Sequence, residues 1–157
     1  MRHIRRSALV GVSPQRMFDL INDVERYPDF VPGCSSARVL EHTPERLRAE
    51  LTVGSGLMKT TFSTSNRLHP PDRIDMQLEA GPLKSLNGSW TLTPLDAGAL
   101  HGCRVELDLA FEPHGNLAAL ALGPVVERLA TSLVDAFVAR AREEGAATPD
   151  VPGSGPA

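Results

Sequence analysis

The chain has 157 residues, of which 41% are hydrophobic and 22% charged, and its formal net charge at pH 7 is −3. This length suits one domain that buries a sizeable core, or a core with a cavity. The mild negative charge disfavours a protein that binds DNA or RNA by general phosphate attraction. We interpret the one dense basic cluster, Arg2, His3, Arg5 and Arg6, as a solvated strand end.

The small number of cysteines and the lack of long apolar runs indicate the cellular compartment. Cys34 and Cys103 are too few for a disulfide scaffold, and the N-terminus lacks the continuous apolar stretch of a secretory signal. No run approaches the roughly eighteen apolar residues of a membrane span. We therefore expect a cytoplasmic protein with reduced thiols, in contact with the inner membrane at most peripherally.

The first elements are a strand and a helix. Residues 1–11 alternate weakly between apolar and polar and predict a strand. Ser13 then offers a helix N-cap, with Pro14 at the first helical position. Apolar residues recur at helical spacing as far as Val24, so a short amphipathic helix is expected over 14–24.

The next segment, residues 27–34, is apolar and stiffened by two prolines. Prolines four residues apart cannot both lie inside one regular helix, yet the large apolar groups between them need cover from water. Such a segment suits a lip over a cavity, or else a plug that closes the bottom of a core, and the sequence leaves both interpretations open. The predicted lip residues are Tyr27, Pro28, Phe30, Val31 and Pro32.

The pattern of residues in the middle of the chain predicts strands. Apolar and polar residues alternate cleanly over 46–53, 74–80 and 104–112, and weaker strands are expected over 36–42, 57–68 and 85–93. Clean alternation indicates one dry and one wet face, which is typical of antiparallel sheets. With the N-terminal strand, seven strands are predicted.

The last element is the strongest helix. An apolar stripe includes Leu129, Leu133 and Phe137, and we interpret Gly123-Pro124 as a kink within one long helix over 116–144. Residues 145–157 are small, proline-rich and predicted to be a disordered tail. The sequence thus predicts a single domain over 1–144 of class α+β. In this helix-grip fold, a curved seven-stranded antiparallel sheet wraps around the C-terminal helix, its one large apolar partner.

Several blocks also resemble a known family over nearly the whole chain, about residues 3–144. The blocks are Ser7-Ala8-Leu9-Val10, Met17-Phe18-Asp19-Leu20, Asn22-Asp23-Val24, Tyr27-Pro28-Asp29-Phe30-Val31-Pro32-Gly33-Cys34, Gly81-Pro82-Leu83-Lys84-Ser85-Leu86-Asn87-Gly88-Ser89-Trp90 and Ala136-Phe137-Val138-Ala139-Arg140-Ala141. They resemble the coenzyme Q-binding proteins of the START-like superfamily (polyketide cyclase/dehydrase, SRPBCC), a group that includes the bacterial ribosome association toxins. This resemblance implies the same helix-grip fold. Gly33 departs from the tryptophan usual in the family, so a bulky ring is missing beside the predicted lip.

The distribution of polar residues disfavours an enzyme. The five histidines are scattered, no paired metal-ligand spacing occurs, and neither Gly-x-Ser sequence forms a nucleophile elbow. Acidic residues such as Glu50, Asp75, Glu79, Glu106 and Asp108 fall on the wet phase of their strands. We therefore predict no catalytic residues, no metal and no cofactor.

Apolar surface remains as the functional feature. One helix cannot fill the whole concave face of a seven-stranded curved sheet, and the chain has only seven aromatic side chains to help, so we expect a void of several hundred cubic ångströms. The predicted cavity walls are Phe62, Met76, Leu78, Trp90, Leu107, Phe111, Leu129, Leu133 and Phe137. Each of these residues also suits ordinary core packing. Trp90 or Asn87 would supply a hydrogen-bond donor.

Three functions follow, in order of preference. The first is non-catalytic binding of ubiquinone or a similar isoprenoid quinone in the cavity, in support of respiration. The second, implied by the resemblance, is a toxin that binds the large ribosomal subunit and blocks subunit joining. The third is a cyclase or dehydratase acting on a polyketide-like substrate, for which the strands offer no obvious acid or histidine.

Overall fold

The computed structural model describes residues 2–54, 59–97, 100–115 and 122–147. Within them, seven strands form one antiparallel sheet, and a long helix follows the last strand. The strands are β1 Arg2–Val10, β2 Cys34–Thr43, β3 Arg46–Val53, β4 Thr60–His69, β5 Arg73–Ala80, β6 Leu83–Ala97 and β7 Leu100–Pro113. The helices are α1 Pro14–Asn22, the 3₁₀ turn η1 Val24–Arg26, α2 Tyr27–Phe30 and α4 Leu122–Ala147.

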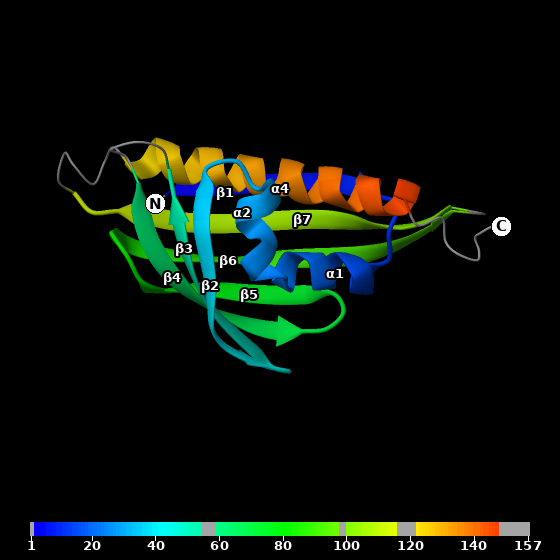
Figure 1. Cartoon of the computed structure of the whole chain (residues 1–157), viewed down its shortest axis with the longest axis horizontal. Coiled ribbons are helices and arrows are strands. Elements are labelled where there is room, and N and C mark those ends of the chain that lie inside the picture. Colours follow the sequence, from blue (N-terminus) through cyan, green and yellow to red (C-terminus); the bar gives the residue numbers. More distant parts are fainter. Residues whose placement is uncertain (1, 55–58, 98–99, 116–121, 148–157) are drawn as a thin grey trace.

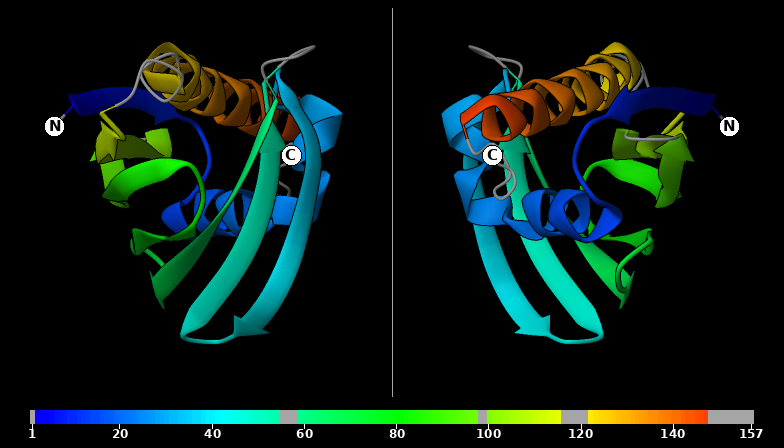
Figure 2. Two further views of the ribbon diagram at one scale, coloured as in Figure 1. Left: turned by 90° about the vertical axis from the view of Figure 1, so that its left-hand side faces the viewer. Right: turned by 90° about the vertical axis from the view of Figure 1, so that its right-hand side faces the viewer.

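The strand order is β1-β7-β6-β5-β4-β3-β2, so every neighbour along the chain from β2 to β7 is also a neighbour in space. Only β1 joins out of sequence, beside β7. The sheet curls so that its two ends approach each other, and α4 lies across the open side (Figures 1 and 2). The predicted helix-grip architecture is confirmed.

The apolar stripe of α4 faces the inner surface of the sheet. Its buried residues recur at spacings of three and four: Val126, Ala130, Val134, Phe137 and Ala141. Polar contacts flank this stripe where α4 runs beside β1. The Nη1 atom of Arg2 lies 2.8 Å from Oε2 of Glu127, and Arg6 donates to the hydroxyl of Thr131 at 3.1 Å. The basic N-terminal cluster therefore includes two residues that join strand to helix.

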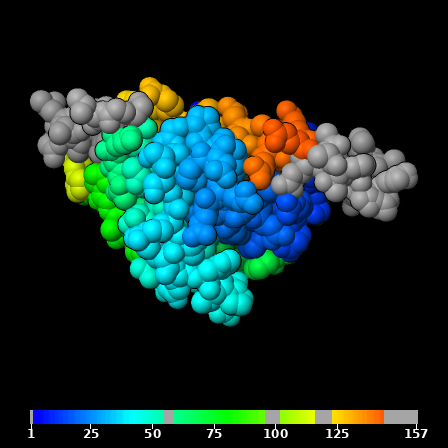
Figure 3. All heavy atoms as spheres, viewed as in Figure 1, coloured from blue at the N-terminus to red at the C-terminus, as the bar shows by residue number. Residues whose placement is uncertain are grey.

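The N-terminal helices form a second cover for the sheet. The hydroxyl of Ser13 accepts a hydrogen bond from the backbone N–H of Arg16 at 3.1 Å, which confirms the predicted N-cap. Four apolar residues of α1 are buried: Met17, Phe18, Leu20 and Ile21. The blue and cyan residues of α1, α2 and β2 form a continuous surface over the middle of the face in Figure 3. Helices α1 and α2 therefore add to the cover that the sequence predicted for α4.

The proline segment is one helical turn rather than an irregular loop. Pro28 lies in the first turn of α2, where its missing N–H leaves no hydrogen bond unmade. Tyr27 and Val31 are buried, and the hydroxyl of Tyr27 donates to the carbonyl of Ile21. Phe30 is half-buried, whereas Pro28 and Pro32 are exposed. This burial fits a plug better than a mobile lip.

The C-terminal ends of two helices differ from those predicted. Helix α1 ends at Asn22, and the chain tightens into the 3₁₀ turn before α2. The described part of α4 starts at Leu122 and includes Gly123-Pro124. The predicted extension over 116–121 lies outside the described residues. The helix continues to Ala147, past the boundary expected at residue 144, and the rest of the predicted tail, 148–157, is likewise outside them.

An aromatic cluster joins α2, β6 and α4. The ring of Phe137, which is fully buried, has its centroid 5.3 Å from that of Tyr27, 5.6 Å from that of Phe30 and 5.5 Å from that of Trp90. All three contacts are edge-to-face, the geometry that aromatic quadrupoles favour. Four of the chain's seven aromatic residues thus meet around one position of α4.

We expect Phe137→Ala to lower the free energy of unfolding by about 3–5 kcal/mol, because the substitution removes a buried ring and leaves a cavity. Urea titration followed by circular dichroism measures this change. Phe30→Ala is the matched control: its ring belongs to the same cluster but is half-exposed, so its loss should cost no more than about 2 kcal/mol. Equal losses for the two variants would contradict the central place of Phe137.

Candidate functional site

A cavity of about 80 Å³ lies between the inner face of the sheet and helices α1 and α4. Its walls are mainly aliphatic. The residues around it are Ile21, Val24, Tyr27, Ala49, Leu51, Phe62, Thr64, Asn66, Met76, Leu86, Trp90, Leu107, Leu109, Val126, Leu129, Ala130 and Leu133.

The structure brings most of the predicted wall residues to this cavity. Six of the nine border it: Phe62, Met76, Trp90, Leu107, Leu129 and Leu133. The other three do not. Phe111 and Phe137 are fully buried in the packed core, and Leu78 is half-buried on β5. Of the predicted lip residues, Tyr27 borders the cavity, whereas Pro28, Phe30, Val31 and Pro32 do not.

The predicted size of the void is wrong. Sites for small molecules usually measure about 300–1,000 Å³, and this cavity is well below that range. The prediction counted only α4 against the sheet, whereas α1 and the plug formed by α2 also contribute buried side chains to the interior. The aromatic cluster around Phe137 fills much of the space that remains.

Two polar side chains interrupt the apolar wall. Thr64 and Asn66 face inward from β4, and the Oδ1 atom of Asn66 is buried without a hydrogen-bond partner. Sequence reasoning missed both, because inward-facing polar residues obscure the alternation of β4. Asn87, which was predicted to offer a donor to a ligand, instead lies on the outer face, since its register position alternates with the inward-facing Leu86.

Burial disfavours ionisation of the two cysteine thiols and of the Tyr27 hydroxyl. Burial raises the pKa of the Cys103 thiol to about 11, and burial also raises the pKa of Cys34. The pKa of the Tyr27 hydroxyl is raised strongly, chiefly by burial and then by the neighbouring Cys34 and Asp23. A raised pKa disfavours the thiolate that nucleophilic catalysis requires.

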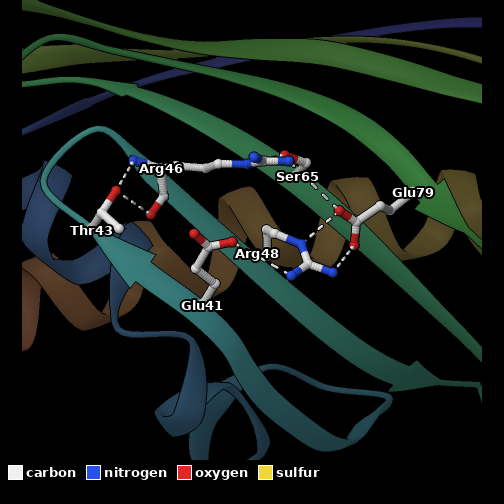
Figure 4. Close-up of polar contacts among 6 residues, drawn as sticks. All are labelled: Glu41, Thr43, Arg46, Arg48, Ser65 and Glu79. Atoms are coloured by element: carbon white, nitrogen blue, oxygen red, sulfur yellow. Dashed lines mark hydrogen bonds and ion pairs between the residues drawn. The ribbon is translucent and has the colours of Figure 1, made fainter.

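The acidic residues predicted on the wet phase lie on the outer face and form ion pairs. The Nε and Nη2 atoms of Arg48 donate to the two carboxylate oxygens of Glu79 at 2.6 and 3.0 Å, and this hydrogen bonding lowers the pKa of Glu79. Figure 4 shows the pair with Glu41 and Arg46 beside it, on the side of the strands away from α4. The other predicted residues pair as Arg38–Glu50, Arg73–Asp75, Arg104–Glu106 and Arg5–Asp108.

Metal-binding clusters and membrane-spanning helices are both absent from the residues that the structure describes. No group of three or more His, Cys, Asp and Glu side chains in this part of the chain is placed to hold a metal ion. Among the helices of the same residues, none has the length and apolar character needed to cross a membrane.

Known proteins are similar in sequence to this chain along most of its length. The ribosome association toxin RatA of Vibrio cholerae is 44% identical over 143 residues, which span 91% of this chain and 97% of the toxin. The mitochondrial coenzyme Q-binding protein coq10 of Schizosaccharomyces pombe is 28% identical over 144 residues, 88% of this chain and 85% of that protein.

A solved structure supports the fold alone. The Zhui aromatase/cyclase of Streptomyces sp. R1128 superposes with a TM-score of 0.74 at 22% identity, covering 92% of this chain and 95% of the enzyme. The family model described as polyketide cyclase/dehydrase and lipid transport matches residues 10–138. The chain therefore belongs to this START-like family, in the group that contains the ribosome association toxins and the coenzyme Q-binding proteins.

Proposed function

We propose that this protein associates with the large ribosomal subunit and blocks its joining with the small subunit. The observation that carries the proposal is the 44% identity to a ribosome association toxin across nearly the full length of both chains. This reverses the order of preference that the sequence suggested, in which quinone binding came first.

The small interior cavity also supports placing ribosome association ahead of quinone binding. A cavity of about 80 Å³ is small beside the usual size of a ligand site, so a complete isoprenoid quinone does not fit without movement of the walls. By contrast, association with a large partner needs a surface, and the outer face of the sheet is rich in charged side chains. The proposed activity needs neither a cofactor nor a catalytic group.

Sucrose-gradient profiles of cell extracts after induced expression test this function. We expect free subunits to accumulate at the expense of joined ribosomes, because a subunit that carries the protein cannot join its partner. The same protein added to purified subunits should slow their joining, as followed by light scattering. An unchanged ratio of joined to free subunits, relative to cells with the empty vector, would dismiss the proposal.

A second candidate function is binding of a hydrophobic molecule, such as part of an isoprenoid quinone, in the central cavity. Two observations favour it: the 28% identity to a coenzyme Q-binding protein, and the Oδ1 atom of Asn66, which lacks a partner in an otherwise apolar wall. Buried polar atoms are normally hydrogen-bonded, so a bound molecule or a water is expected there.

Ala130→Leu tests occupation of the cavity. Ala130 borders the cavity and is 2% exposed, so the added carbon atoms should fill an empty space and raise the free energy of unfolding by about 1 kcal/mol. Any quinone found by mass spectrometry in organic extracts of the purified protein should disappear from the variant.

The matched control is Ala141→Leu, on the same helix. Ala141 is fully buried but does not border the cavity, so the same change should overpack the core and cost about 1–3 kcal/mol. If extracts of the unaltered protein contain no quinone and titration detects no binding, the second function is excluded. If a quinone is retained by Ala130→Leu, the site lies elsewhere.

A further inference from the structure

The outer face of the sheet is hollowed across β3, β4, β5 and β6, on the side away from α4. The groove there measures about 850 Å³, roughly ten times the central cavity, and its lining is mainly polar. Hydroxyl and amide groups of Thr43, Ser65, Gln77 and Asn87 line it together with the guanidinium groups of Arg46 and Arg67.

The two arginines oppose each other across neighbouring strands. Arg46 of β3 and Arg67 of β4 are register partners, and like charges directly opposite on one face of a sheet are destabilising. Arg46 turns away: its Nε atom donates to the hydroxyl of Ser65 at 3.0 Å, and its Nη2 atom lies 3.9 Å from Oε2 of Glu79 (Figure 4). Arg46 therefore has partial compensation for its charge.

The charge of Arg67 has no such compensation among the described residues, although a carboxylate lies close to it in the sheet. Its register partner on the other side is Asp75 of β5. Both oxygens of Asp75 are already engaged, Oδ1 with Nε of Arg73 at 2.9 Å and Oδ2 with Nε2 of His69 at 3.2 Å. Arg67 is exposed and makes no hydrogen bond or ion pair within the part of the chain that the structure describes.

A local conflict of this kind is expected most often at a functional site, where a bound partner can offset its cost. An anion seated between Arg46 and Arg67 would remove the repulsion and satisfy the free guanidinium. Guanidinium groups match the phosphate geometry in a bidentate manner, and neighbouring hydroxyl and amide groups suit phosphate and ribose oxygens.

We propose that this groove binds the phosphate backbone of ribosomal RNA in the large subunit, an inference that rests on the proposed function. The contact is local, because the net charge of −3 provides no general attraction to RNA. Glu45, also in the groove and without a cation partner among the described residues, opposes the phosphate and limits the affinity.

Arg67→Glu tests the groove by cosedimentation of the purified protein with purified large subunits at several salt concentrations. We expect a loss of affinity of roughly tenfold or more, together with a shallower dependence of affinity on salt, since one phosphate contact is lost. The variant places an opposite charge across from Arg46 and a like charge across from Asp75, so the two effects oppose each other and the melting temperature should change little. If the variant binds large subunits more weakly but melts at an unchanged temperature, the loss of binding comes from the lost contact and not from unfolding.

Two further variants complete the design. Arg128→Glu makes the same change of charge at an exposed position of α4, away from the groove, and should bind like the unaltered protein. Glu45→Lys removes the opposing carboxylate and should bind more tightly, by several fold.

The outcomes distinguish failure of the groove proposal from failure of the proposed function. If the unaltered protein binds large subunits and Arg67→Glu binds equally well, the groove proposal is overturned and the proposed function stands. If the unaltered protein does not bind, both fail. If inorganic phosphate or a mononucleotide alone saturates the groove at submillimolar concentration in an NMR titration, the groove is a small-anion site and the RNA proposal is overturned.

Discussion

Burial of the apolar stripe of α4 against the inner face of the sheet is the constraint on which the rest of the structure depends. A one-faced antiparallel sheet exposes a continuous apolar surface unless another layer covers it. At 26 residues, α4 is about 39 Å long, enough to cross the curled sheet. The sheet must curl for strands far apart in the order to reach one helix, and this curvature creates the inner space.

The N-terminal helices decide how much of the inner space stays empty. Their buried residues, with the aromatic cluster around Phe137, reduce the interior to a cavity of about 80 Å³. The fold is shared with cyclases and with lipid-binding proteins, so the architecture alone does not select a function. In this chain the small cavity and the identity to a ribosome association toxin favour a function exercised at the surface.

The outer face shows how stability and recognition can conflict. Most of its charges are satisfied within the sheet, as in the double hydrogen bond between Arg48 and Glu79. The opposed pair Arg46 and Arg67 departs from this pattern, since the nearest register carboxylate, Asp75, is occupied by Arg73 and His69. Exposed ion pairs contribute little to stability individually, so the arrangement of these charges has little effect on the fold.

Much of the fold could be predicted from the sequence, because period-two alternation and the helical stripe depend on local geometry. Alternation identified inward residues such as Leu107, and the family blocks identified the group to which the chain belongs. The inward-facing Thr64 and Asn66 were not identified, since polar residues on the inner face obscure the alternation of β4. For the segment around Tyr27 the sequence left both a lip and a plug open, and the burial of Tyr27 favours the plug.

The sequence by itself therefore determined the number of strands, the inward face of most apolar strand residues and the long C-terminal helix. The size of the cavity and the isolation of Arg67 were decided only by the tertiary structure. Both depend on strand register and on packing between segments far apart in the chain, and no local pattern of residues encodes those distances.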